Sequence, residues 1–201
     1  MRERSSTERE EKMIQSAVVV KFTYEDYLLF PENGNRHELI DGDHFMSPAP
    51  RTVHQSILLN LSNAFFNFLK KSRLGKIFIA PTDVVFSDLD VVEPDLLFIA
   101  SKNSHIITEK NIQGAPDLVV EILSESTRKT DEIIKRKLYE RYGVQEYWIV
   151  DTELEMVKIY CMTEKGYIRT AEISCALNAV LTTSLLPGME IKLTEIFEIK
   201  V

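Results

Sequence analysis

Two carboxylates, Glu121 and Asp95, lie in apolar runs of the sequence, where a charged side chain is unfavourable unless it has a partner or a function. Glu121 lies within residues 118–123, a run with apolar side chains on both faces, which predicts an interior β-strand. Asp95 follows Pro94 at the start of a second apolar run. Because burying an unpaired carboxylate costs several kcal/mol, Glu121 must have a cationic partner, carry a proton or bind a metal.

A third acid, Glu38, lies on the first strand of a predicted β-hairpin over residues 36–47. Asp41-Gly42 supplies the tight turn of that hairpin. Glu38 either joins the other two acids or pairs with Arg36 or His37 beside it, and the sequence leaves both options open.

A lysine follows the Glu121 strand on a predicted helix over residues 132–143, which ends in Gly143. At about 100° per residue, Asp131 falls in the apolar stripe of this helix and Lys135 at its edge. Lys135 is therefore the lysine best placed to lean toward the strands, and Lys137 is second choice. Asp131 and Lys135 also have the spacing of an ordinary helix ion pair.

These residue types together suit one reaction, the hydrolysis of phosphodiester bonds. Two or three carboxylates that converge on one point bind a hard divalent cation such as Mg²⁺, with Mn²⁺ as a substitute. A lysine beside the cation can orient or help to deprotonate a bound water and offset charge in the transition state. The candidate catalytic residues are Glu38, Asp95, Glu121 and Lys135, with Asp95, Glu121 and Glu38 as metal ligands.

The elements that must position these residues alternate along the chain and predict one α/β (α+β) domain, with a mixed central sheet flanked by helices. Residues 1–16 are predicted to be a flexible tail and 17–201 the domain. Residues 101–114 are predicted to be a mobile polar excursion. Helices are expected at 23–29, 53–71 and from 194, and further strands at 76–80, 83–86, 91–100, 146–150 and 156–160.

Composition narrows the classes of function. The chain has 201 residues, a formal net charge of −7 and a pI near 5.2, so binding to nucleic acid needs a local basic patch. Cys161 and Cys175 are too few for a disulfide framework and have no zinc-binding spacing, which favours the cytoplasm. Residues 1–15 are charged and lack the apolar core of a secretory leader, and no apolar run is long enough to cross a membrane, so we expect a protein that is neither secreted nor embedded in a membrane.

Several motifs resemble one known group, the Uma-type family of "putative restriction endonucleases" in the PD-(D/E)XK nuclease superfamily. They cover about residues 23 to 160, which is most of the chain. The matching segments are His37-Glu38-Leu39-Ile40-Asp41-Gly42, Met46-Ser47-Pro48-Ala49-Pro50 with His54, Glu93-Pro94-Asp95-Leu96, Gly114-Ala115-Pro116-Asp117-Leu118-Val119-Val120-Glu121, Ser126-Thr127-Arg128, and Tyr139 with Gly143-Val144-Gln145-Glu146-Tyr147-Trp148.

The resemblance implies a restriction-endonuclease-like fold, with Asp95 and Glu121 as metal ligands and Glu38 as a supporting acid. The superfamily lysine usually stands two residues after the second acid, where this chain has Leu123. In the Uma-type pattern that lysine has moved to the next helix, which implies Lys135 here. The expected substrate is double-stranded DNA, and a homodimer built from the Glu146–Trp148 strand and the C-terminal strands would suit its two-fold symmetry.

Rival functions remain open at this level. The same fold could be an inactive module that binds nucleic acid or protein, or a metal-independent hydrolase such as a glycosidase. Individual residues also have structural alternatives. His54 could cap a helix or line the cleft, Asp83 is a secondary candidate, and Arg128 and Lys129 could meet phosphates. The aromatic residues Tyr139, Tyr147 and Trp148 are expected in the core.

Overall fold

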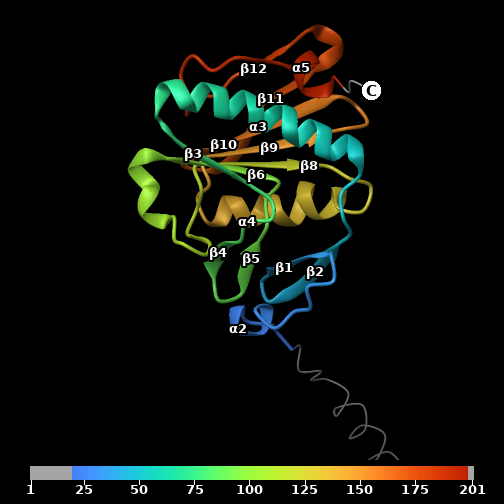
Figure 1. Cartoon of the computed structure of the whole chain (residues 1–201), viewed down its shortest axis with the longest axis vertical. Coiled ribbons are helices and arrows are strands. Elements are labelled where there is room, and N and C mark those ends of the chain that lie inside the picture. Colours follow the sequence, from blue (N-terminus) through green and yellow to red (C-terminus); the bar gives the residue numbers. More distant parts are fainter. Residues whose placement is uncertain (1–19, 199–201) are drawn as a thin grey trace, which may run out of the picture.

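A six-stranded mixed sheet forms the centre of the protein in the computed structural model, which describes residues 20–198 (Figure 1). Its strand order is β11-β10-β9-β8-β6-β3, with β8 and β9 parallel and all other neighbours antiparallel. The predicted tail, residues 1–16, lies outside the described residues. The strands are β3 (Gly75–Ile79), β6 (Leu96–Ala100), β8 (Leu118–Ile122), β9 (Glu146–Asp151), β10 (Met156–Thr163) and β11 (Gly166–Ser174).

A smaller five-stranded sheet lies at the end of the molecule nearest α2 (Tyr24–Tyr27), in the order β2-β1-β5-β4-β7 (Figure 1). Its hairpin confirms the predicted turn, since Asp41 and Gly42 have positive φ angles of 53° and 72°. Thr23 and Asp26 cap α2 reciprocally, as the N-cap threonine predicted. The strands are β1 (Arg36–Ile40), β2 (Asp43–Ser47), β4 (Val84–Ser87), β5 (Asp90–Val92) and β7 (Ile112–Gln113).

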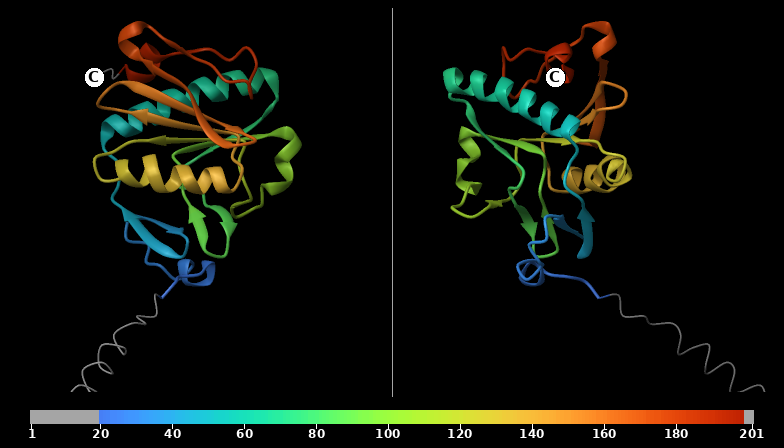
Figure 2. Two further views of the ribbon diagram at one scale, coloured as in Figure 1. Left: turned by 180° about the vertical axis from the view of Figure 1, so that it is seen from behind. Right: turned by 45° about the vertical axis from the view of Figure 1, so that its right-hand side comes forward.

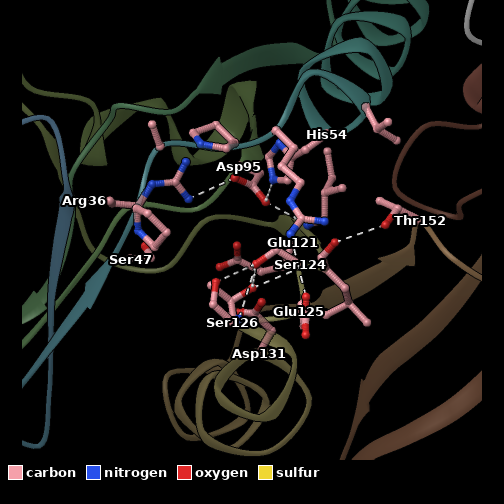
Figure 3. Close-up of a pocket in the computed structure, with 18 of the residues that line it drawn as sticks. Arg36, Ser47, His54, Asp95, Glu121, Ser124, Glu125, Ser126, Asp131 and Thr152 are labelled. Atoms are coloured by element: carbon pink, nitrogen blue, oxygen red, sulfur yellow. Dashed lines mark hydrogen bonds and ion pairs between the residues drawn. The ribbon is translucent and has the colours of Figure 1, made fainter.

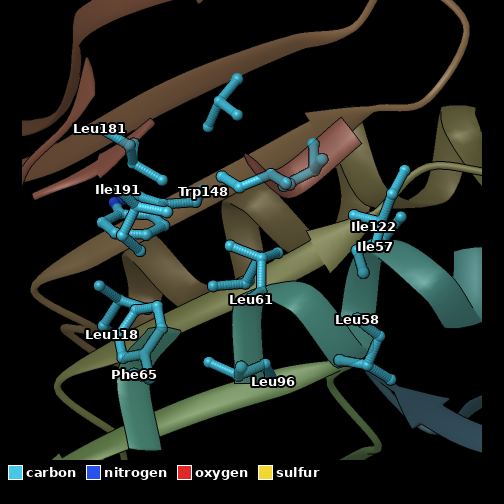
Figure 4. Packing of buried hydrophobic residues seen from close by; sticks show 14 of the residues in the cluster. Ile57, Leu58, Leu61, Phe65, Leu96, Leu118, Ile122, Trp148, Leu181 and Ile191 are labelled. Carbon is cyan, nitrogen blue, oxygen red and sulfur yellow. The ribbon is translucent and has the colours of Figure 1, made fainter. Parts of the chain in front are cut away.

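The long helix α3 (Thr52–Ser72) covers one face of the central sheet, as its apolar spacing predicted. Side chains alternate along β8, so Leu118, Val120 and Ile122 pack on this side with α3 (Figure 4). The C-terminal segment completes the layer with β12 (Val180–Leu181), β13 (Ile191–Lys192) and α5 (Leu193–Phe197).

The opposite face of the central sheet is covered by the helix after β8 and by residues of the smaller sheet (Figure 2). Val119 and Leu123 pack there against Leu138 and Tyr139. Glu121 has the same parity along β8 as these two apolar residues, so the alternation of the strand directs its carboxylate toward this helix.

That helix differs from the prediction in its geometry. It continues without a break from a π-helical segment, η2 (Thr130–Lys135), into α4 (Arg136–Arg141). The wider π turn brings both Asp131 and Lys135 onto the buried face, whereas the 100° spacing put Lys135 at the edge. Lys137 is exposed.

The secondary structure predicted for two segments was wrong. Residues 91–100 are not one strand but β5 and β6, which belong to different sheets, because Pro94 cannot donate a ladder hydrogen bond. Residues 101–114 are not a loose excursion but form a 3₁₀ helix, η1 (Ser101–Ile106), and β7, which pairs with β4. Asp117 anchors η1 by accepting hydrogen bonds from the Ala100 amide and the Asn103 side chain.

The β9 part of the predicted dimer surface was wrong. All six residues of β9 are buried, and the strand lies between β8 and β10. A fully covered interior strand leaves no surface for a second subunit. Within residues 20–198, no helix is both long and apolar enough to cross a membrane.

Candidate active site

The antiparallel pairing of β6 and β8 brings the two principal acids together. Leu96 pairs with Val120, and continuing that register by one residue places Asp95 opposite Glu121. Both carboxylates line a pocket of about 720 Å³ and are almost fully buried, with 2% and 1% exposure (Figure 3). The rest of its wall comes largely from the loops at 47–51 and 124–127.

Asp95 is held by three donors. The Arg36 Nη1 donates to Oδ1 at 2.9 Å, the Ile122 amide donates to Oδ2 at 2.7 Å, and His54 Nε2 lies 3.1 Å from Oδ2. Burial raises the pKa of Asp95, but the hydrogen bond with His54 and the charge of Arg36 outweigh it and bring the pKa to about 2. Asp95 is therefore ionised at neutral pH.

Lys135 lies at the centre of a second group of acids. Its Nζ is 2.8 Å from Glu38 Oε1, 3.0 Å from Glu121 Oε1 and 3.5 Å from Asp131 Oδ1, and its side chain is 3% exposed. Burial lowers the pKa of Lys135, but these three carboxylates outweigh burial and raise it well above its usual value. Lys135 is thus a fixed cation that can donate hydrogen bonds, and it is a poor proton acceptor.

The group carries more negative charge than its cations balance. Burial and the nearby carboxylates raise the pKa of Glu121 to about 8, against the opposing effect of Lys135. Burial likewise raises the pKa of Asp131 to about 6. The Tyr139 hydroxyl donates to Glu121 Oε1 at 2.6 Å. At neutral pH the Glu121 carboxyl is thus the group that holds a proton when no other cation is present.

This imbalance predicts a pH-dependent stability. A carboxyl whose pKa is higher in the folded than in the unfolded state stabilises the fold fully below its unfolded pKa and loses that contribution as pH rises through the folded value. Glu121, with a reference value of 4.5, and Asp131, with 3.8, both act in this direction. In EDTA, the melting temperature should fall by several °C between about pH 6 and pH 8.5.

The measurement is thermal unfolding followed by circular dichroism, with Glu121→Gln as the matched variant. That variant lacks the raised carboxyl and should show a much flatter pH profile. Asp95, whose low pKa acts in the opposite direction, changes stability only in acid, below its reference value of 3.8. An equally steep fall in the variant would show that Glu121 is not the titrating group.

The pocket chemistry fits a hard divalent cation. Asp95, Glu121 and Asp131 all line it, and Asp131 Oδ1 is buried without a hydrogen-bond partner among the described residues. Across residues 20–198, no three His, Cys, Asp or Glu side chains are already arranged to hold a metal ion. Mg²⁺ often takes only one or two carboxylates and keeps several waters, so the donor set suits it.

Not every predicted site residue reaches the pocket. Glu38 contacts Lys135 and accepts a hydrogen bond from the Glu93 amide, but it does not line the pocket. Asp83 accepts a hydrogen bond from the Tyr27 hydroxyl at 2.7 Å and also lies outside it.

The structure also bears on the roles predicted for Arg128 and for three aromatic residues. Arg128 is engaged by Asp151 and Glu153, so it is not available to meet phosphates without breaking those ion pairs. Tyr147 and Trp148 are buried in the core, as predicted. Tyr139 is buried too, and its hydroxyl additionally contacts Glu121, which the sequence did not indicate.

Two residues of the pocket were absent from the predicted site. The sequence indicates Asp131 only as a helix ion-pair partner of Lys135, although its place in the apolar stripe is a usable signal of a buried role. The sequence suggests Arg36 only as a partner of Glu38, and no local pattern indicates that it pairs with Asp95, 59 residues away. Sequence-distant ion pairs of this kind follow from the packing of β1 beside the central sheet.

Comparisons with known proteins agree with this architecture. A family model described as "Uma2: Putative restriction endonuclease" matches residues 24–194. The chain is also similar to a solved structure from Anabaena variabilis, described as "a putative nuclease belonging to DUF820". The TM-score is 0.73 at 20% sequence identity, over 88% of this chain and 97% of that one, which shows a shared fold. A search of curated proteins gave no match.

Proposed function

This chain belongs to the Uma2 family, described as "Putative restriction endonuclease", and from that premise we propose that it is a Mg²⁺-dependent endonuclease that hydrolyses phosphodiester bonds in DNA. The observation that carries the proposal is the meeting of Asp95 and Glu121 in one pocket, with Lys135 Nζ 3.0 Å from Glu121. Paired carboxylates beside a fixed ammonium suit metal-assisted hydrolysis of a phosphate ester.

Asp95 and Glu121 would hold the cation. Among residues 20–198, both hydrogen bonds that the Glu121 carboxylate accepts end on Oε1, which leaves Oε2 for a metal. A bound Mg²⁺ would supply Lewis-acid stabilisation of the charge that develops on the phosphate. Asp131 is the third carboxylate within reach, with one oxygen free of hydrogen bonds.

Lys135 would position the water that attacks phosphorus and offset negative charge in the transition state. Its high pKa keeps it charged, so it orients the water by donating a hydrogen bond. Glu38 would support the site through Lys135, because its Oε1 fixes the ammonium at 2.8 Å. Tyr139, which does not line the pocket, would orient the Glu121 carboxylate through the hydrogen bond from its hydroxyl.

The decisive experiment combines metal binding with DNA cleavage. Mg²⁺ and Mn²⁺ are titrated by calorimetry into the wild type and into the Asp95→Asn/Glu121→Gln double variant, and both proteins are then tested for nicking of plasmid DNA. The wild type should bind metal and nick, whereas the double variant should do neither. Folded proteins that both fail to bind metal would overturn the proposal.

A second candidate is a catalytically inactive module that binds nucleic acid or protein on the same fold. The observation in its favour is that Asp95 already has Arg36, His54 and the Ile122 amide as partners. Under this alternative, DNA binding persists in EDTA and Glu121→Gln leaves the affinity unchanged.

We further propose that residues 17–201 act as one nuclease domain and that the protein works in the cytoplasm as a homodimer on duplex DNA. Both cysteines, Cys161 and Cys175, are free thiols, which suits a reducing compartment. Because β9 is interior, the subunit contact would use the C-terminal part of the predicted surface, such as the edge strand β11. Light scattering at several concentrations would test the oligomeric state.

A further inference from the structure

We propose that Arg36 is the phosphate-binding residue of this pocket, and that Asp95 masks it until substrate enters. The inference rests on the proposed function and adds a residue to it. In the free protein, Arg36 Nη1 donates to Asp95 Oδ1 at 2.9 Å. A phosphate oxygen would replace that carboxylate oxygen as the partner of the guanidinium.

The position of Arg36 meets the requirements for this role. It lines the pocket next to Asp95, while its side chain is only 19% exposed, so a phosphate bound there would be partly shielded from water (Figure 3). Its second acidic neighbour is Glu93, at a longer Nε to Oε2 distance of 3.8 Å. The guanidinium has five N–H donors, and among the described residues one of them makes a hydrogen bond.

The other cations of the pocket are less suited to the task. Lys135 Nζ has three N–H donors and three carboxylates within 3.5 Å, so it has no donor to spare for a phosphate. Arg51 stands at the rim, 84% exposed, and pairs loosely with Glu125 at 3.7 Å. Arg36 is therefore the buried cation with spare donors, and a guanidinium matches the geometry of a phosphate better than an ammonium does.

A single substitution, Asp95→Asn, should free the Arg36 guanidinium from its carboxylate partner. In Asp95→Asn, the Ile122 amide still needs an acceptor at 2.7 Å, so the amide oxygen stays on that side. The new NH₂ group then faces Arg36, and two donors repel each other. The guanidinium is released from its partner and becomes free for an oxyanion.

The experiment titrates inorganic phosphate into the full-length protein in EDTA and follows binding by ³¹P NMR. Asp95→Asn should bind phosphate roughly tenfold more tightly than wild type, the factor expected for one charge-assisted contact. Adding Arg36→Gln should remove this gain, whereas adding Arg51→Gln, a rim cation of equal charge, should preserve it.

Asp131→Asn, measured at neutral pH, controls for the general loss of one negative charge in the same pocket. Asp131 lines the pocket, has a pKa of about 6 and is not hydrogen-bonded to Arg36. Any gain from this substitution should be smaller and should survive Arg36→Gln. A second measurement, the ¹⁵Nε resonance of Arg36 in Asp95→Asn, should shift on adding phosphate, and it needs no variant at position 36.

The inference is wrong if Asp95→Asn gains nothing, or if its gain survives Arg36→Gln and the Arg36 resonance stays still. These outcomes are independent of catalysis because metal is absent. If the wild type nicks plasmid DNA but Asp95→Asn gains no phosphate affinity, the proposed function stands and the role of Arg36 in binding phosphate is rejected. If Asp95→Asn gains phosphate affinity through Arg36 but the wild type does not nick DNA, the role of Arg36 stands and the nuclease activity is rejected.

Discussion

Replacing Glu121 by Gln is expected to lower the rate of plasmid nicking by at least about a hundredfold, while leaving the fold as stable as wild type or more stable. The substitution removes a charge from a site where Lys135 lies 3.0 Å away and where a cation would bind. It also removes a carboxyl whose pKa is raised to about 8, so the variant should melt at a higher temperature above neutral pH.

The opposite signs of these two effects make the test specific. A residue that serves only the fold would lose stability when changed, and activity would follow. Nicking is measured at saturating Mg²⁺ and melting is measured in EDTA, with Glu109→Gln as an exposed control outside the pocket. If Glu121→Gln nicks at the wild-type rate, the pocket does not carry the proposed reaction.

Replacing Lys135 by Met should destabilise the protein by about 3–5 kcal/mol at pH 8, the cost of removing one partner from a buried charge group. Lys135 is the ammonium shared by Glu38, Glu121 and Asp131, which all lie within 3.5 Å of its Nζ. Without it, these acids must take up protons or admit water. Urea unfolding followed by circular dichroism measures the loss.

Two variants sharpen this second test. Lys137→Met, two residues along the same helix but exposed, should change the free energy of unfolding by less than about 0.5 kcal/mol. Lys135→Met/Glu38→Gln should regain part of the lost stability, because one uncompensated acid is gone. A Lys135→Met protein as stable as the Lys137 control would contradict the ion-pair arrangement and, with it, a fixed ammonium at the site.

The acids could be identified from sequence because each interrupts a strong pattern. Glu121 stands in a run of apolar residues on both strand faces, and Asp95 opens the next apolar run after Pro94. Period-two alternation then fixes which face of β8 receives Glu121. The hairpin, the long helix α3 and the mixed α/β architecture likewise follow from local turn residues and periodic spacing.

What could not be predicted depends on tertiary structure. The π turn at Thr130–Lys135 has no local signature, and a uniform 100° spacing therefore leaves Lys135 at the edge of the buried face. The assignment of β5 and β6 to different sheets depends on pairing partners distant in sequence. The ion pair between Arg36 and Asp95 is likewise invisible until β1 is packed beside the central sheet.

The hydrogen bond from the Ile122 amide to Asp95 makes this backbone group a natural reporter of events in the pocket. Its 2.7 Å length ties the amide's ¹H chemical shift to the charge on the carboxylate. Ile122 is also nearly fully buried, so its exchange with deuterium requires the strand to open. One resolved peak in a two-dimensional NMR spectrum could therefore follow cation and ligand binding at equilibrium, without a label or a cleavage assay.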